Sequence, residues 1–179
     1  MIPLPSLSEA LAPIEAALDA ATSDERVNWM RGLGKRELVA LWSLAEGRPL
    51  SLDDLAANDG EVVIHEGQNS LPLFNAFQKR MVRRNGGVQG YNHQAMSWIT
   101  GPGHFIVREG AGAAYFDYTE VPRDAPAEFP PVKPNDAGLS KLVYAGMIDR
   151  LRKVAHHTLI GLAEKGGKAT GDYFMLVRR

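Results

Sequence analysis

The segment from Ala95 to Tyr118 constrains the fold most, because short β-type clusters alternate there with glycine-bearing turns. The clusters are Trp98-Ile99, Phe105-Ile106-Val107 and Tyr115-Phe116, and the breaks are Gly101-Pro102-Gly103 and Gly110-Ala111-Gly112. Runs of β-branched and aromatic residues separated by such turns are typical of an antiparallel meander. The segment therefore predicts three antiparallel strands.

The second turn of this meander predicts which side chains share a face. A two-residue loop at Gly110-Ala111 would pair Glu109 with Gly112 and place His104 opposite Asp117. A four-residue loop would keep the faces but place Ile106 opposite Asp117 and Arg108 opposite Tyr115. In both registers one face is apolar, with Phe105, Val107, Ala114 and Phe116, and the other carries His104, Arg108, Tyr115 and Asp117.

Residues 1–58 have the patterning of helices. Apolar side chains recur at helical spacing in a helix that Ser8 can cap, in a second that Ser23 can cap, and over Lys35–Glu46. Ser51-Leu52-Asp53-Asp54 resembles a capping box that opens one short turn. We expect this helical section to cover one face or end of a sheet.

Residues 60–179 are expected to form that sheet. Strands are predicted over Glu61–His65, Leu142–Tyr144, Thr158–Ala163 and Tyr173–Val177, whereas Met147–Ala155 is ambiguous between helix and strand. One crossing helix is predicted near Ser70–Arg84, because Leu73, Phe74, Phe77 and Met81 fall on one helical face. About seven strands suit a closed, barrel-like sheet, so the chain is expected to be one α+β domain.

Composition excludes several classes of function. At 179 residues, with 45% hydrophobic and 23% charged residues, the chain fits one soluble globular domain. The absence of cysteine excludes disulfides and thiolate chemistry and fits a cytoplasmic protein. A net charge of −1 removes the footprint of a nucleic-acid binder. No apolar run approaches the ~20 residues that a membrane span needs.

Sequence motifs for metal, nucleotide and serine chemistry are also missing. The five histidines, His65, His93, His104, His156 and His157, form no metal-ligand spacing, so no metal site is expected. There is no Gly-x-Ser-x-Gly elbow and no Gly-x-Gly-x-x-Gly opening a helix. We therefore expect no cofactor, with haem kept as an alternative because one histidine is enough to ligate its iron.

A barrel of this size predicts an interior site for a small hydrophobic molecule. Four aromatic residues are expected in the walls of an apolar cavity: Trp98, Phe105, Phe116 and Tyr173. Polar groups near strand ends can line the mouth of such a cavity, and His65, His93 and Asn69 are the candidates. The leading functional hypothesis is therefore binding of a small hydrophobic ligand.

Two other functional classes remain open. In the first, a cofactor-independent lyase, isomerase or cyclase would use His104 as a base oriented by Asp117. Tyr115 could then donate to an oxyanion and Arg108 could hold a carboxylate or enolate. Alternatively, His104 and Asp117 are a solvent-facing cross-strand pair. In the second class, the apolar surfaces serve self-association, as in a homodimer, which sedimentation would detect.

Several segments resemble the GXWXG-type proteins, a bacterial and fungal family of largely undefined function. The similar segments are Phe77–Met81, Leu142–Val154, Thr158–Gly161 and Tyr173–Arg179. The resemblance implies a lipocalin-like or calycin-like barrel around an apolar ligand and carries no catalytic residue over. The naming motif itself is not present, because Gly60–Ile64 has neither its tryptophan nor its second glycine.

Overall fold

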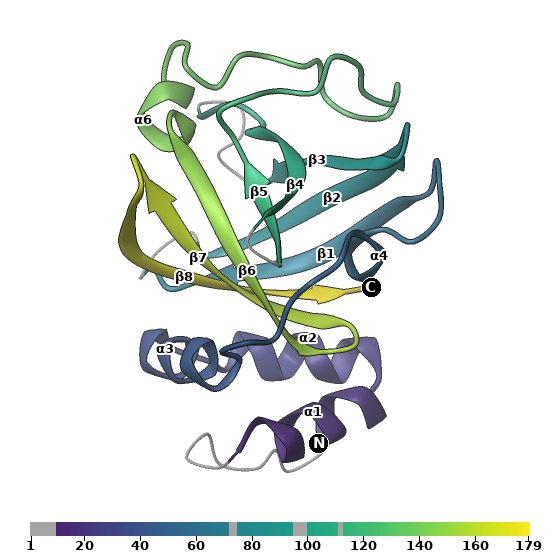
Figure 1. Cartoon of the computed structure of the whole chain (residues 1–179), viewed down its shortest axis with the longest axis vertical. Helices are drawn as coiled ribbons and strands as arrows, with labels where there is room; N and C mark the ends of the chain where they lie inside the picture. The colour runs from purple at the N-terminus through teal and green to yellow at the C-terminus, as the bar shows by residue number, and fades with distance from the viewer. Residues whose placement is uncertain (1–9, 72–74, 95–99, 111–112) are drawn as a thin grey trace.

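The computed structural model describes residues 10–71, 75–94, 100–110 and 113–179. Eight antiparallel strands follow one another around a closed barrel, and the last pairs with the first (Figure 1). The α+β, calycin-like barrel that the sequence predicts is confirmed, with one strand more than expected. The strands are β1 (Val62–Asn69), β2 (Ala76–Arg84), β3 (Gly87–His93), β4 (His104–Gly110), β5 (Ala113–Asp117), β6 (Met147–Ala155), β7 (Thr158–Lys165) and β8 (Lys168–Arg178).

The β4–β5 hairpin confirms two strands of the predicted meander and corrects the register. Gly110 pairs with Ala113, so Asp117 lies opposite Ile106 and Tyr115 opposite Arg108. The pairing of His104 with Asp117 is therefore wrong, and the partners are those of the alternative register. Residues 111–112 of the turn, and the third cluster Trp98-Ile99, lie outside the described residues.

The crossing helix predicted near Ser70–Arg84 is wrong, because Ala76–Arg84 forms strand β2 between β1 and β3. Phe77, Lys79 and Met81 alternate inward, so the same residues that suggested helical spacing also satisfy the two-residue period of a strand. Leu73 and Phe74 lie outside the described residues. The ambiguous segment Met147–Ala155 is strand β6.

The short strand predicted at Leu142–Tyr144 is also wrong. These residues belong to helix α6 (Ser140–Tyr144). Gly146 follows with a φ of 70°, a left-handed conformation that glycine adopts without strain, and β6 begins at the next residue. The turn at Gly146 therefore separates helix α6 from strand β6.

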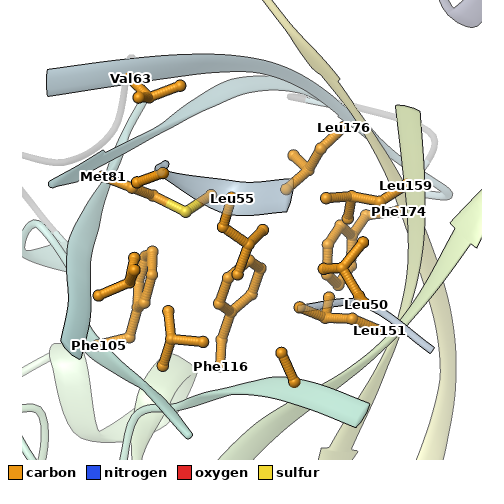
Figure 2. Packing of buried hydrophobic residues seen from close by; sticks show 14 of the residues in the cluster. Leu50, Leu55, Val63, Met81, Phe105, Phe116, Leu151, Leu159, Phe174 and Leu176 are labelled. Carbon is orange, nitrogen blue, oxygen red and sulfur yellow. The ribbon is translucent and has the colours of Figure 1, made fainter. Parts of the chain in front are cut away.

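A core of apolar side chains fills one part of the barrel (Figure 2). Phe105, Val107, Ala114 and Phe116 belong to it, which confirms the predicted apolar face of the hairpin. Leu50 and Leu55, the second of them from helix α4 (Leu52–Leu55), enter the same core. The backbone N–H of Ala114 donates to the Leu50 carbonyl at 2.9 Å. Residues 50–56 thus close one end of the barrel.

The remaining helices pack outside the barrel. Helices α1 (Leu11–Ala20), α2 (Ser23–Arg31) and α3 (Lys35–Leu44) lie against β6, β7 and β8, below the barrel in the view of Figure 1. A second apolar cluster joins them to the strands, so the predicted helical section covers the barrel over its described residues 10–58. No helix in the described part of the chain is long and apolar enough to cross a membrane.

Two predicted helix caps can be compared with the structure. The capping box of Ser51 and Asp54 is confirmed, with the Ser51 backbone N–H donating to Asp54 Oδ2 at 2.9 Å. Helix α2 is capped by Thr22 rather than Ser23, because Thr22 and Glu25 form a reciprocal capping box. Ser8 lies outside the described residues.

Candidate ligand-binding site

Four polar side chains meet inside the barrel, and we call them the interior cluster: Lys79, Asn92, Tyr118 and Asp149. Lys79 of β2 is the direct cross-strand partner of Asn92 on β3, so both point inward. Asp149 of β6 is the partner of the core residue Phe116, and Tyr118 follows Phe116 by two positions. Strand periodicity therefore brings together residues that are up to 70 positions apart.

Lys79 donates to all three of the other members. Its Nζ lies 2.8 Å from Asn92 Oδ1 and 3.3 Å from Asp149 Oδ2, and it also bonds to the Tyr118 hydroxyl. The side chains of Lys79 and Asp149 are only 3% and 4% exposed. An ion pair this deeply buried gains most of its support from additional hydrogen bonds, and the cluster supplies them.

Asn92 and Tyr118 complete the hydrogen bonding. The Tyr118 hydroxyl donates to Asp149 Oδ2 at 3.2 Å, and Asn92 Oδ1 is a second acceptor 3.4 Å away. Asn92 Nδ2 donates to the Tyr118 oxygen at 3.2 Å and to the Gly103 carbonyl at 3.3 Å. Each amide and hydroxyl group of the cluster therefore has a partner within the barrel.

Aromatic rings surround the ammonium group of Lys79. Its Nζ lies between 4.7 and 5.6 Å from five ring centroids, those of Phe77, Phe105, Phe116, Tyr118 and Phe174. Such distances are within the range of cation–π attraction. The low exposure of Lys79 and Asp149 strengthens the electrostatic interactions of the cluster.

Burial shifts the pKa of each titratable member. It lowers the pKa of Lys79 and raises that of Asp149, while the attraction between the two groups opposes both shifts. Burial, with the charge of Asp149 as the next cause, raises the pKa of Tyr118 well above its ordinary value, so the phenol keeps its proton. With Lys79 as an ammonium and Asp149 as a carboxylate, the ion pair leaves the cluster without net charge.

A cavity of about 700 Å³ leads from the surface to this cluster. The cavity opens near the start of β2, at Ala76 and Phe77. The closed end of the barrel lies near the other end of β2, where Arg83 donates to the Ala56 carbonyl. Its apolar lining includes the side chains of Phe77, Tyr144, Met147, Ala163 and Phe174. The dimensions and lining are those of a small-molecule site.

The mouth of the cavity carries exposed apolar side chains. Leu71, Leu142 and Val143 line it, and Leu142 is 73% exposed. Further in, Gln94 Nε2 donates to the Tyr144 hydroxyl at 3.1 Å, and the Tyr144 ring stacks on Tyr118 with centroids 5.4 Å apart. Polar side chains, among them Lys165 and Asp172, share the lining with these apolar groups.

The four residues proposed for catalysis lie on the outer face of the barrel. His104 is buried beneath the segment that carries Pro130 and Pro131; burial lowers the pKa of its ring, and the backbone of that segment and of Gly90 opposes the shift. The Asp117 carboxylate instead accepts from Arg108 Nε at 2.8 Å and from Thr119. The His104–Asp117 dyad does not form, because the register of the hairpin places Asp117 opposite Ile106, where its carboxylate bonds to Arg108 and Thr119.

The predicted ligand-binding residues are divided between the cavity and other places. Tyr173 and Asn69 line the cavity, and Phe105 and Phe116 lie in the barrel interior beside the interior cluster. His65 pairs with Lys79 across β1 and β2 and so faces inward. The side chain of His93 is exposed. Trp98 lies outside the described residues.

Sequence reasoning missed all four members of the interior cluster. Lys79 and Asp149 were not singled out, because a charged residue at an inward position breaks the apolar alternation that marks a strand. One signal was present: Lys79 falls in Phe77–Met81 and Asp149 in Leu142–Val154, two of the segments that resemble GXWXG-type proteins. That resemblance stays a prediction.

Neither a metal site nor a known relative supplies further evidence about the function. Among the residues with described positions, no group of three or more His, Asp or Glu side chains could hold a metal ion. No family model matches the chain, and no curated protein or solved structure matches it either. The functional argument therefore rests on the geometry of the cavity and the interior cluster.

Proposed function

We propose that the barrel binds a small, mainly apolar molecule in its cavity, with one polar group of that molecule reaching the interior cluster. The observation that carries this proposal is a cavity of about 700 Å³ whose apolar walls end at Lys79 and Asp149. Pockets of roughly 300–1,000 Å³ with a few convergent polar groups are typical of small-molecule sites. The cluster would orient the molecule and the aromatic walls would supply affinity.

The buried ion pair supports a ligand site better than a purely structural role. Replacing a buried pair by apolar residues is often neutral or stabilising, so stability alone gives little reason for a lysine and an aspartate inside a barrel. Both groups also line the cavity, where a ligand would contact them. Their position at the inner end of an apolar passage is what recognition of an amphipathic molecule requires.

A cofactor-independent lyase, isomerase or cyclase acting in the same cavity is the second candidate. The observation in its favour is that Lys79, Tyr118 and Asp149, all with shifted pKa values, meet at the cavity. These residues would replace His104 as the proton-transfer groups. The two candidates differ in one observable: an enzyme releases a changed molecule, whereas a binder releases the one it took up.

The proposed function is tested by native mass spectrometry of the purified protein, followed by solvent extraction. We expect a bound small molecule, and we expect Ala163→Phe, which places a ring in the cavity, to lose it. The matched control is Ala127→Phe, which adds the same ring at an exposed loop position. Retention of the molecule by Ala163→Phe, or its loss from both variants, would contradict the proposal. The same extract reports haem.

A further inference from the structure

The hydrogen-bonding capacity of the interior cluster is unequally used. Lys79 has three N–H donors, and these match its three acceptors on Asn92, Tyr118 and Asp149. The two N–H groups of Asn92 Nδ2 donate to the Tyr118 oxygen and to the Gly103 carbonyl. The cluster therefore has no unused N–H donor to offer a ligand.

An acceptor, by contrast, remains available on Asp149. Its Oδ2 receives both Lys79 and Tyr118, while its Oδ1 accepts no hydrogen bond from any described residue. That oxygen is not among the fully buried atoms without a partner, and Asp149 lines the cavity. A carboxylate oxygen facing an apolar cavity needs a donor, because leaving it unpaired carries a large desolvation cost.

The charges around the cavity disfavour an ionic ligand. Lys79 and Asp149 together carry no net charge, so a carboxylate entering the cavity would meet Asp149 while finding Lys79 already fully bonded. A ligand ammonium would meet the charge of Lys79. At the mouth, Lys165 and Asp172 also have opposite signs and add no net charge. Burying an uncompensated ligand charge here would be costly.

We infer that the bound molecule is electrically neutral and presents a hydrogen-bond donor, such as a hydroxyl group, to Oδ1 of Asp149. The inference rests on the proposed function and adds the chemical class of its ligand: an apolar alcohol rather than a fatty acid or an amine. Two observations support the inference. All N–H donors of Lys79 already have acceptors, and Oδ1 of Asp149 accepts no hydrogen bond from any described residue.

Four probes of matched chain length test the inference by equilibrium dialysis at about pH 8, where the acid and amine are ionised. They are decan-1-ol, 1-methoxydecane, decanoate and decylammonium. We expect decan-1-ol to bind about tenfold or more tightly than each of the others. The ether is the sharpest comparison, because it is more apolar than the alcohol and a purely hydrophobic cavity would prefer it.

The variant Asp149→Asn should change this selectivity, because it removes the carboxylate while keeping the side-chain shape. We expect the affinity for decanoate relative to decan-1-ol to rise about tenfold or more, since the repulsion between two carboxylates is lost. Asp117→Asn is the matched control, because it makes the same change on the outer face of the barrel, and it should leave all four affinities unchanged.

The outcomes separate this inference from the function on which it rests. Equal or tighter binding of 1-methoxydecane, decanoate or decylammonium to the wild-type protein would overturn the inference and leave the proposed function standing. Binding of no probe, together with an empty cavity in native mass spectrometry, would overturn the proposed function itself. The wild-type comparison decides the matter even where Asp149→Asn fails to fold.

Discussion

Replacing Asp149 by alanine is expected to lower the free energy of unfolding by about 3–5 kcal/mol, because Lys79 would remain buried without its counter-charge. The side chain of Lys79 is only 3% exposed and is held inside the barrel by Asn92 and Tyr118, so it cannot simply turn into solvent. Chemical denaturation of the variant and the wild-type protein measures the difference.

Two further variants give this experiment its controls. Glu164→Ala breaks the outward-facing pair with Arg150, the neighbour of Asp149 on β6, and should cost less than about 1 kcal/mol because Arg150 is 43% exposed. The double variant Lys79→Met with Asp149→Leu should recover most of the lost stability. A loss below about 1 kcal/mol for Asp149→Ala would contradict the description of a fully desolvated pair.

Acidification is expected to destabilise the protein through His65. This side chain is 1% exposed, neither ring nitrogen has a partner in the described structure, and burial lowers its pKa to about 3. Below pH 6.5, His65 is protonated in the unfolded chain but stays neutral in the folded protein. The free energy of unfolding therefore falls with pH until His65 is also protonated in the folded protein, near pH 3. The expected loss from this one residue at about pH 4.5 is about 3 kcal/mol.

The variant His65→Leu isolates this effect from that of His104, whose pKa burial also lowers. The free energy of unfolding of the variant should fall less between about pH 7 and pH 4.5, by about 3 kcal/mol, than that of the wild-type protein. Parallel pH dependences for the two proteins would show that His65 does not stay neutral inside the barrel.

The parts of the fold that could be predicted are those where sequence pattern and environment agree. The faces of β4 and β5 were predictable because Phe105, Val107, Ala114 and Phe116 recur at every second position of the two strands. Their register was not, because it depends on which residues form the turn after Gly110. The expected turn paired Glu109 with Gly112, whereas the structure pairs Gly110 with Ala113. This difference changes the cross-strand partner of Asp117 from His104 to Ile106.

The candidate site could not be predicted, because its residues contradict the pattern of the strands that carry them. Lys79 sits between Phe77 and Met81 at an inward position of β2, so the apolar spacing of that segment favoured a helix. Asp149 does the same in β6, which left that strand ambiguous. Their partnership spans 70 positions and exists only once the barrel closes.

The location of a bound molecule tests the central claim most directly, and methionine methyl groups report it. In a protein labelled with ¹³C-methyl methionine, decan-1-ol should shift the NMR signal of Met147, which lines the cavity. Met30 and Met175, which pack between the outer helices and the barrel, should not respond. Shifts at Met30 or Met175 without a shift at Met147 would place the molecule outside the barrel and contradict the account.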